Sequence, residues 1–487
     1  MRMRIARTLV AAAAGALALA LPTVSHAAGA PALAEGLAAV RSVDSGEPAR
    51  PAAGRQLRVL RSNPRYFTDG RGKAVYLTGS HVWWNLTGPD RWSACGDAAS
   101  RFDFDRYLDF LERHGHNFIR LWRVEHTRWE SECGGTTTTA FQPWLRTGPG
   151  AAHDGLPRFD LTRLDSAYFD RLRDRVAAAR ERGIYVSVML FDGWSLHSAG
   201  EPWNWTGHPF HPDNNVNGID GDADGNGDGT DIVTLANRDV LAIQKAYVRK
   251  VVETVNGFDN VLYEIANEAG HWSIRWQYHM IRFVKALQRE RGEERPVGMT
   301  FMHPGGSNRA LYRSPADWIS PFGKRYMRNP RPADGRKVII SDNDHHCGLC
   351  GDATFPWRSF LRGLNPIYMD DLDLDRPDPA RDAIRAAMGQ TRLYAERIRL
   401  AASRPRPELA STRYALAAGT RQFLVYAPKG GRFTVDLRKA RGRYSVEWFR
   451  PATGRTLERG KLRRGGSVRA FAAPFPGSSV LLLRRVR

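Results

Sequence analysis

Residues 260–272 read NVLYEIANEAGHW, an apolar run that ends on the polar pair Asn267 and Glu268. The run has the length of a β-strand. A strand that only fills a core has no reason to end on an unpaired acid, whereas a strand that delivers a carboxylate to a cleft does. We therefore interpret this stretch as a strand with a functional group at its C-terminal end.

Seven further runs are also short, mainly apolar and bounded by turn residues, as β-strands are. They are VYLTGS (75–80), FIRLW (118–122), IYVSVML (184–190), PVGMTF (296–301), DWISP (317–321), KVIIS (337–341) and PIYMD (366–370). Patterns with helical spacing of apolar residues lie between several of them, at 104–115, 168–183, 238–255, 276–290 and 380–398. Eight strands interleaved with helices predict an α/β fold, the (β/α)8 or TIM barrel.

The end of the chain has a different pattern. From residue 405 to 487 apolar alternation and turns replace the long helical periods, which predicts a small all-β sandwich. The barrel is expected over 56–402. Residues 66–80, with DGRG at the centre, predict a hairpin at its start.

The N-terminus is typical of a secretory signal. Arg2 and Arg4 precede an apolar stretch at 8–22, and Ser25 and Ala27 occupy the small positions before a cut. We expect a signal peptide over 1–27, a flexible Ala/Pro/Gly-rich linker over 28–55, and a secreted mature protein without a membrane span.

The four cysteines of an exported chain favour disulfides, with three connectivities open. We prefer Cys95–Cys133 and Cys347–Cys350. A single C-x-x-C lacks the second ligand pair of a structural zinc site.

The chain has 72 Lys and Arg against 51 Asp and Glu, a formal net charge of +21. Such an excess can serve nucleic acid or acidic polysaccharide. The arginines are scattered and form no long run, so we interpret the charge as a bias of composition spread over solvated surface.

Catalytic groups of a barrel lie at the C-terminal ends of its strands. The fourth run ends on Glu268, and the seventh leads into Asp342, Asp344 and His345. Two carboxylates that face each other across a cleft are the requirement of glycoside hydrolysis: one protonates the leaving oxygen, and the other attacks the sugar or activates water. We expect Glu268 to be the acid, and either Asp344, which we favour, or Asp342 to be its ionised partner.

The motifs YEIANE and NFIRLW resemble the fourth-strand acid/base motif and the second-strand Arg segment of the cellulase-like glycoside hydrolases of clan A. The resemblance implies that Asn267 binds a sugar hydroxyl and that Arg120 orients the second carboxylate. That clan usually has Glu after its seventh strand, where this chain has Asp.

The opening NPRYFTDGRGKAVYLTGSHVWWN and the tail YSVEWFRPATGRT look like a narrower group, secreted barrels with a C-terminal collagen-binding-type β-domain, within a broader apiosidase-like set. The name of that domain denotes a fold, and no feature of the tail indicates collagen recognition.

Further polar and aromatic residues follow the predicted strands and fit a sugar cleft, since aromatic faces stack on sugar rings and polar groups hold hydroxyls. The candidates for substrate binding are His81, Trp83, Trp84, Trp122, Glu125, Asp192, Trp194, His303 and His345. Each Trp has an alternative as a plug of the barrel rim, and Glu125 as a structural ion pair.

The loop DGDADGNGDGTD (220–231) matches D-x-D-x-D-G with an acid at the twelfth position, a pattern of calcium-binding loops. The expected ligands are Asp220, Asp222, Asp224, Asp228 and Asp231, with the backbone carbonyl of Asn226. The alternative is a solvated insertion. The chemistry itself requires no cofactor.

These features favour a secreted glycoside hydrolase that acts as a monomer on a polysaccharide or oligosaccharide. The alternatives are a barrel that binds carbohydrate or matrix without activity, and a basic nucleic-acid-binding protein. Two acids at strands four and seven argue against the first. The second lacks both a nucleic-acid motif and a clustered basic stripe, so we expect neither nucleic acid nor membrane as a partner.

Overall fold

The computed structural model describes residues 56–88, 91–92, 100–130, 136–139, 141–198 and 203–486. The expected signal peptide, the linker and both cysteines of the predicted Cys95–Cys133 pair lie outside these residues. A disulfide joins Cys347 and Cys350, as predicted. Among the helices of the described ranges, none has the length and apolar character that a membrane crossing needs.

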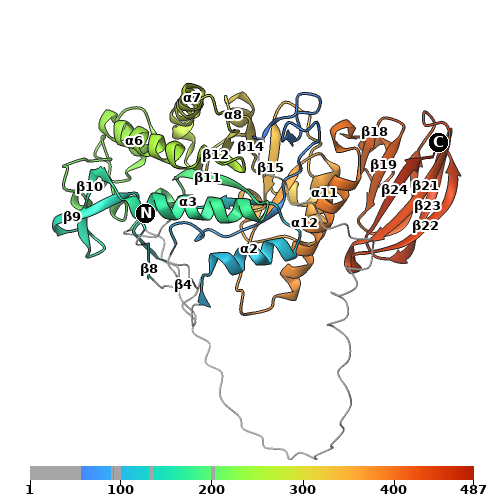
Figure 1. Ribbon diagram of the computed structural model, residues 1–487, viewed down its shortest axis with the longest axis horizontal. Coiled ribbons are helices and arrows are strands. Elements are labelled where there is room, and N and C mark those ends of the chain that lie inside the picture. The colour runs from blue at the N-terminus through green and yellow to red at the C-terminus, as the bar shows by residue number, and fades with distance from the viewer. Residues whose placement is uncertain are drawn as a thin grey trace, which may run out of the picture. The chain divides into compact units, whose positions relative to one another are not determined.

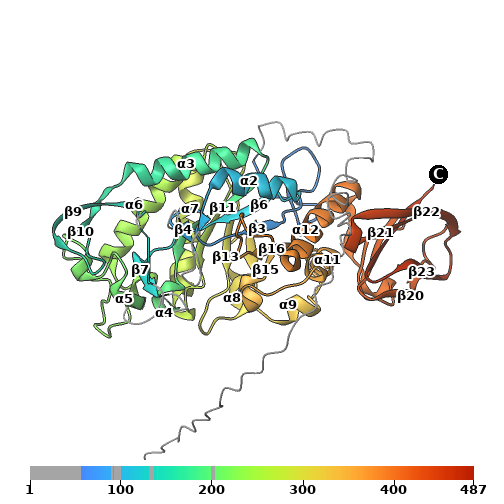
Figure 2. The same ribbon diagram turned by 90° about the horizontal axis from the view of Figure 1, so that it is seen from below.

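Eight parallel strands form the barrel (Figures 1 and 2). They are β3 (Gly79–His81), β6 (Phe118–Leu121), β11 (Tyr185–Asp192), β12 (Val261–Asn267), β13 (Val297–Thr300), β14 (Trp318–Ser320), β15 (Val338–Asp342) and β16 (Asn365–Met369). Their order in the sheet is β3-β16-β15-β14-β13-β12-β11-β6. All eight predicted strands are present, and the predicted (β/α)8 fold is confirmed.

The barrel closes where β3 meets β6. The backbone N–H of Asn117 donates to the carbonyl of Thr78 at 2.9 Å, and the N–H of Thr78 donates to the Asn117 side chain at 3.0 Å. A Cβ atom at position 79 would lie 2.2 Å from the carbonyl oxygen of Phe118. Only glycine permits this approach.

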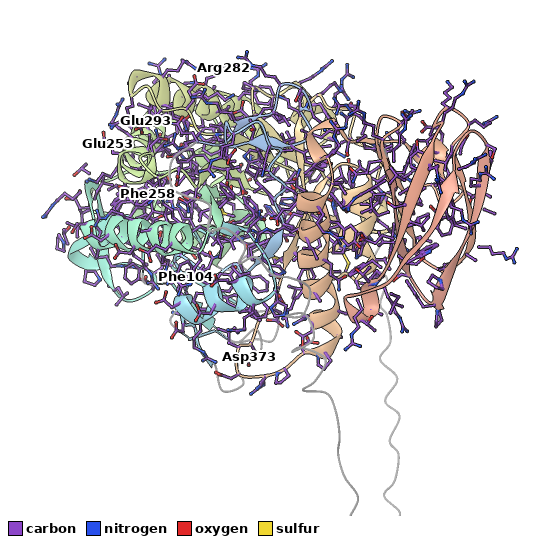
Figure 3. The ribbon with its side chains drawn as sticks, turned by 45° about the vertical axis from the view of Figure 1, so that its right-hand side comes forward. Phe104, Glu253, Phe258, Arg282, Glu293 and Asp373 are labelled. Atoms are coloured by element: carbon purple, nitrogen blue, oxygen red, sulfur yellow. A yellow bond between two sulfur atoms is a disulfide. The ribbon has the colours of Figure 1, made fainter. Side chains whose placement is uncertain are left out.

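Helices surround the barrel (Figure 1). The five that the sequence predicts are α2 (Phe104–Arg113), α3 (Ser166–Glu181), α6 (Arg238–Val255), α7 (Ile274–Glu290) and α12 (Pro379–Arg397). Their exposed faces are polar: Glu253 on α6 and Arg282 on α7 lie at the periphery (Figure 3). Shorter helices, which the sequence did not predict, are α4 (Ser195–Ser198), α5 (Trp203–Thr206), α8 (Asn308–Arg313), α9 (Arg325–Arg328), α10 (Asp344–Cys347) and α11 (Thr354–Leu361).

Among the described residues, four antiparallel pairs of strands lie in the same region of the chain as the barrel. They are β1 (Arg58–Val59) with β2 (Phe67–Thr68), β4 (Arg91–Trp92) with β5 (Ser100–Arg101), β7 (Arg128–Glu130) with β8 (Thr136–Thr138), and β9 (Trp144–Ala151) with β10 (Pro157–Leu164). The hairpin predicted over 66–80 is reduced to one bridge between Phe67 and Val75. Its first arm pairs with β1 instead, because its second arm is drawn into the barrel as β3.

The C-terminal region is all β, as predicted. A six-stranded sheet has the order β17-β18-β19-β24-β21-β22, and β20 pairs with β23. The strands are β17 (Arg404–Pro405), β18 (Ala415–Ala418), β19 (Gln422–Ala427), β20 (Gly430–Asp436), β21 (Arg443–Arg450), β22 (Arg455–Arg464), β23 (Val468–Pro476) and β24 (Ser479–Arg485). One apolar core, which includes Phe423, Val435, Trp448, Phe471 and Leu481, is drawn from both sheets.

The second face of the six-stranded sheet is also covered. Leu424 on β19 and Leu482 on β24 share an apolar cluster with Trp357 on α11 and Tyr394 on α12, and α11 and α12 lie beside this sheet in Figure 1. Buried on both faces, β24 is apolar without alternation over residues 480–483. This sheet is therefore part of the support of the barrel.

A polar contact lies within the same interface. Glu447 on β21 is buried and accepts hydrogen bonds from the hydroxyl of Tyr394 at 3.0 Å and from the guanidinium of Arg397 at 2.9 Å. The carboxylate is thus paired, which a buried charge requires.

Candidate active site

Arg120 on β6 joins the ends of three barrel strands. Its Nε donates to Glu264 Oε2 on β12 at 2.9 Å, and its Nη2 donates to Asn267 Oδ1 at 2.7 Å. Its Nη1 donates to Asp342 Oδ2 on β15 at 2.9 Å and to Asp344 Oδ2 at 3.4 Å. The guanidinium is buried, so each contact is made in a medium where charges interact strongly.

Glu264 is a site residue that the sequence analysis did not single out. It is fully buried and faces both Arg120 nitrogens, Nε and Nη2. The signal was present, because an acid inside the otherwise apolar run VLYEIA needs a buried partner.

Asp342 and Asp344 differ in access. Asp342 has no exposed surface and receives hydrogen bonds from His81, Arg120 and the backbone N–H of Asp344. Asp344, at the start of α10, keeps 10% of its side chain exposed. Of these two acids, Asp344 is therefore the one that can meet a substrate.

The hydrogen bonds of His81 define its tautomer. Trp122 Nε1 donates to His81 Nδ1 at 3.0 Å, so Nδ1 carries no proton. The proton is on Nε2, which lies 3.0 Å from Asp342 Oδ2 and 3.1 Å from Oδ1. His81 Nε2 is consequently a donor that orients Asp342.

The orientation of Asn267 follows from the same reasoning. Its Oδ1 accepts from Arg120 and lies 3.3 Å from His345 Nε2, while His345 Nδ1 lies 2.7 Å from the hydroxyl of Ser320. Burial, followed by the charge of Arg120, lowers the pKa of His345 well below its usual value, so the ring is neutral. The Nδ2 of Asn267 is then the atom left to donate to a substrate hydroxyl.

Glu268 follows β12 with a left-handed backbone, φ 47°. Its carbonyl oxygen lies 3.3 Å from His197 Nε2, and the preceding carbonyl, of Asn267, accepts from the N–H of Gly193 at 2.9 Å. A Cβ at 193 would lie 2.3 Å from the Cα of Ala269, which explains the glycine. The left-handed backbone of Glu268 is costly for a residue other than glycine, and such backbones are typical of functional sites.

The carboxyl groups of Glu268 and Asp344 interact. Burial, and then the charge of Asp344, raises the pKa of Glu268 well above its usual value. Burial, and then the charge of Asp342, raises the pKa of Asp344 to about 7 despite the nearby Arg120. Burial acts in the same direction on Asp342, but His81 and Arg120 outweigh it and lower its pKa.

The sequence led us to expect that the second carboxylate is held ionised by Arg120. Asp342 fits that expectation, whereas Asp344 is only partly ionised at neutral pH. The reason is that Arg120 is shared among three carboxylates, so that its charge does not offset the burial of Asp344.

The other candidates for substrate binding fall into two groups. Trp84, Trp122 and Asp192 are buried: Trp122 stacks on His81, and Asp192 accepts from the Ser195 hydroxyl and the Trp194 N–H. Burial raises the pKa of Asp192 to about 7. Trp83 and Trp194 are partly exposed and His303 is exposed, with its ring 5.4 Å from that of His197.

Glu125 matches its alternative as a structural ion pair. It is buried, lies 2.9 Å from Arg123 and 3.6 Å from His208, and accepts from the N–H of Asp192. Burial raises its pKa, but Arg123 and His208 outweigh burial and the net pKa is lowered.

The acidic loop brings three of its five predicted carboxylate ligands together. Carboxylate oxygens of Asp222, Asp224 and Asp231 lie within 4.8 Å of one another, and Asp220 and Asp228 are not part of this group. Asp220 instead accepts from the N–H of Asp222, and Asp228 from the N–H of Thr230. Oxygen ligands of this kind suit Ca²⁺.

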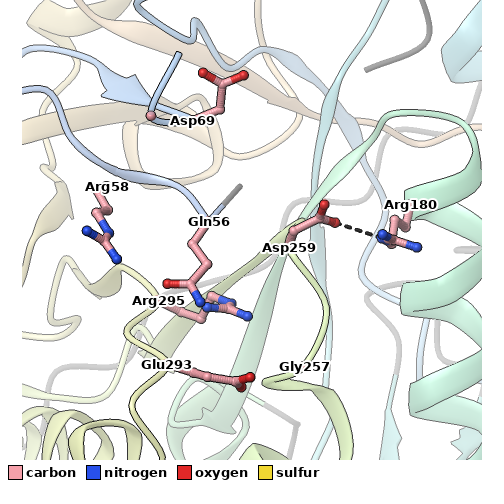
Figure 4. Close-up of a pocket in the computed structure, with 9 residues that line it drawn as sticks. Gln56, Arg58, Asp69, Arg180, Gly257, Asp259, Glu293 and Arg295 are labelled. Atoms are coloured by element: carbon pink, nitrogen blue, oxygen red, sulfur yellow. Dashed lines mark hydrogen bonds and ion pairs between the residues drawn. The ribbon is translucent and has the colours of Figure 1, made fainter. Parts of the chain in front are cut away.

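A polar pocket of about 550 Å³ lies at the other end of the strands (Figure 4). Asp259 in its wall precedes β12, whereas Glu268 follows that strand. Asp259 pairs with Arg180 at 2.7 Å, and Arg58, Glu293 and Arg295 also line the pocket. The N-terminal end of barrel strands serves stability rather than catalysis, so we do not place chemistry there.

Two family models match parts of the chain. Residues 121–303 match the one described as "Domain of unknown function (DUF6298)". Residues 407–483 match the one described as "Putative collagen-binding domain of a collagenase". Each covers less than half of the chain. No curated protein matches it in sequence.

Solved structures are similar over most of the chain. A structure described as "Glycoside hydrolase" is 13% identical with a TM-score of 0.56, and covers 88% of this chain and 97% of its own. A glycoside hydrolase family 5 protein from Bacteroides vulgatus is 12% identical with a TM-score of 0.58, covering 88% and 93%. A "putative glycoside hydrolase" from the same organism is 13% identical with a TM-score of 0.60, covering 91% and 84%. The expected resemblance to cellulase-like barrels with a C-terminal β-domain is thus confirmed at the level of the fold.

Proposed function

We propose that the protein is a glycoside hydrolase in which Glu268 is the general acid and Asp344 is the second catalytic carboxylate. One observation carries the proposal. The ends of β12 and β15 present two carboxyl groups with some exposure, Glu268 and Asp344, above a buried layer formed by Arg120, Glu264 and Asp342.

Glu268 is suited to donate a proton. Its raised pKa favours the protonated form of the carboxyl, as a general acid requires. It would protonate the glycosidic oxygen as the bond to the anomeric carbon breaks. Asn267, with Oδ1 fixed by Arg120, presents Nδ2 to a hydroxyl of the adjacent sugar.

Asp344 acts once it has lost its proton. As a carboxylate it either attacks the anomeric carbon or accepts a proton from an attacking water, depending on its separation from Glu268: about 5–5.5 Å for retention and 6.5–9.5 Å for inversion. Asp342 does not reach the substrate. It positions Arg120 and His81, and its negative charge raises the pKa of Asp344.

The substrate class follows from the aromatic residues that come after β3 and β11. Trp83 and Trp194 offer partly exposed rings for stacking on sugars. We propose a polysaccharide or oligosaccharide as substrate, an exported monomer as the working form, and no cofactor in the chemistry. The similar structures described as glycoside hydrolases support this class.

Reducing-sugar release from a panel of polysaccharides tests the proposal. Glu268→Gln should lower activity on substrates with poor leaving groups by about a hundredfold or more, because the proton donor is lost. It should lower activity on aryl glycosides less, since a good leaving group needs no proton. Asp344→Asn should abolish both activities, and NMR of the first-formed anomer would assign retention or inversion.

The matched control is Glu293→Gln, the same substitution in the pocket at the opposite end of the strands. It should leave both activities unchanged. A Glu268→Gln protein with full activity on the natural polysaccharide would overturn the proposal.

A further inference from the structure

The positive charge of the chain is concentrated in its last part. Residues 405–487 hold 19 Lys and Arg and 4 Asp and Glu, which makes +15 of the total of +21 in about one sixth of the length. A bias of composition alone would spread the charge evenly, as we expected from the sequence. The concentration therefore calls for a local explanation.

The strand register gathers many of these cations at one end of the C-terminal region. Arg443 on β21 is directly opposite Arg464 on β22, and Tyr444 is opposite Arg485 on β24. The N–H of Arg485 donates to the carbonyl of Arg421 at 2.9 Å. The loop between β20 and β21 joins the same end, since Gly442 and Leu437 accept from Gly465 and Gly466.

We call this surface the basic end; it lies where β24 finishes (Figure 1). Its exposed members are Arg421, Arg438, Lys439, Arg441, Arg443, Arg463, Arg464 and Arg485.

Of the acids in this region whose side chains the structure describes, one pairs with a member of the basic end. Asp436 pairs with Arg438 at 2.6 Å. Glu408 pairs with Arg406, and Glu447 is buried against Arg397 of α12. Among the described side chains, no ion pair reaches the other seven cations.

The cations of the basic end destabilise the fold, and no described ion pair at this end offsets the repulsion between the opposed arginines of β21 and β22. Like charges directly opposite each other on neighbouring strands repel, yet Arg443 faces Arg464. Neighbouring strands are about 4.7–4.9 Å apart, so these strands present closely spaced cations. A bound polyanion would relieve the repulsion.

We propose that the basic end binds an acidic polysaccharide and holds the protein on it. Arginine pairs with carboxylate and sulfate groups through two parallel hydrogen bonds. The aromatic side chains of the described residues 405–486, Tyr444 at this end among them, are all buried, so none of them offers a ring on which the bases of a single-stranded nucleic acid could stack. The choice of a glycan among polyanions rests on the proposed function of the barrel.

The test measures binding of the full chain to soluble polymers by affinity electrophoresis and titration. The quadruple variant Arg441→Glu/Arg443→Glu/Arg464→Glu/Arg485→Glu reverses the centre of the basic end. The control Lys429→Glu/Arg432→Glu/Arg406→Glu/Arg413→Glu makes the same change of net charge among exposed or partly exposed residues elsewhere in the region. Polygalacturonate, dextran sulfate, a neutral glucan, duplex DNA and anionic vesicles are the probes.

We expect the protein to bind polygalacturonate or dextran sulfate. Comparison of the two polymers shows whether the basic end recognises carboxylate or sulfate groups. The quadruple variant should raise the Kd about tenfold or more while the control changes it little, and binding should weaken with salt, because these charges are exposed and screened within about 8 Å at 0.15 M. Equal losses in both variants, binding of neutral glucan alone, or tighter binding of DNA or vesicles would overturn the proposal.

Two further measurements separate this inference from the proposed function. Glu268→Gln should bind the acidic polymer as the natural protein does, even if the barrel hydrolyses nothing. The quadruple variant should keep its activity on small neutral aryl glycosides, which do not reach the basic end. Loss of that activity in a folded variant would contradict a separate binding surface.

Discussion

Glu268 combines a left-handed backbone with a carboxyl whose pKa is raised by burial and by the charge of Asp344. Both features are unfavourable in isolation, by about 1–3 kcal/mol for the backbone alone, and the surroundings hold them in place. The N–H of Gly193 donates to the carbonyl of Asn267, and the ring of His197 lies beside the carbonyl of Glu268 itself. These contacts hold the backbone at Glu268 and so fix the position from which its side chain projects.

The pH profile should identify the second carboxylate. If Asp344 must be ionised, kcat/KM rises with pH through about 7, where that carboxyl loses its proton, and falls again only above the raised pKa of Glu268. If Asp342 were the catalytic group, its lowered pKa would leave the rate without a fall between pH 7 and 5. A profile measured on an aryl glycoside decides between them.

Asp342→Asn provides the control for this profile. Removing the negative charge beside Asp344 should lower the pKa of Asp344 and shift the acidic limb to lower pH, because a like charge disfavours the anion. A variant that loses activity at every pH with an unshifted limb would show that Asp342 does not act through Asp344.

At this scale the sequence was informative about strand ends and less so about the layer beneath. Asn267, Glu268 and Asp344 could be located because they follow apolar runs. Glu264 is visible in the sequence as an acid in an apolar run, but its partner Arg120 could not be assigned, nor could the contact of Ser320 with His345, since the barrel brings these distant strands together. The pKa of Asp344 depends on how Arg120 is shared among acids, which spacing along the chain does not reveal.

At the scale of elements, β24 shows how burial determines composition. Leu482 is buried against the barrel helices, and its neighbour Leu481 against the sandwich core. Leu482→Ala should lower the free energy of unfolding by about 2–5 kcal/mol. Leu457→Ala on β22, where the side chain is 46% exposed, should change it little. Chemical denaturation measures both, and equal effects would contradict the packing described for β24.

The acidic loop allows a second test at this scale. If Asp222, Asp224 and Asp231 hold Ca²⁺, chelation should lower the Tm and added calcium should restore it. At a hundred times its Kd, calcium should add about 2.7 kcal/mol to the free energy of unfolding. Asp224→Asn should remove most of this response, whereas Asp228→Asn, outside the cluster, should keep it. A Tm that does not respond to a chelator would leave the loop as a solvated insertion.

The helices that the sequence revealed are those with long periods. The five long helices have enough residues for their period to show, whereas α9 and α10, with four residues each, do not. The barrel strands were recognised from apolar runs between turn residues, even where the strand itself is as short as β3 and β14, with three residues each. The β9–β10 hairpin was missed although Asp154-Gly155 marks its turn. Its arms contain Gly and Pro, which strand patterns usually exclude.

For the whole molecule, the double coverage of the six-stranded sheet predicts one cooperative unfolding event. Heating in a calorimeter should give a single transition for barrel and C-terminal region together, since their apolar cluster is shared. Replacing Trp357 with Asp should weaken that interface and separate the trace into two transitions. Two transitions in the natural protein would mean that the shared cluster contributes little.

The change of sequence pattern after residue 402 was visible, but the interface between the two regions was not. Sequence alternation shows that a strand has a buried face, and an unbroken apolar run shows two, without naming the neighbour on either side. The charge concentration was in the printed sequence from the start; only the register of β21, β22 and β24 shows that its members meet.

The covered sheet also limits how such a chain can be rearranged. Engineers often treat a C-terminal β-domain as a cassette to be cut out and fused to another catalyst. Here the excised domain would expose an apolar surface formed by Leu424, Tyr426 and Leu482. The remaining barrel would expose the apolar residues of α11 and α12 that pack against that surface. A successful domain fusion would therefore have to include both apolar surfaces, or replace the apolar side chains of the exposed one by polar side chains. Natural recombination at this boundary is subject to the same restriction.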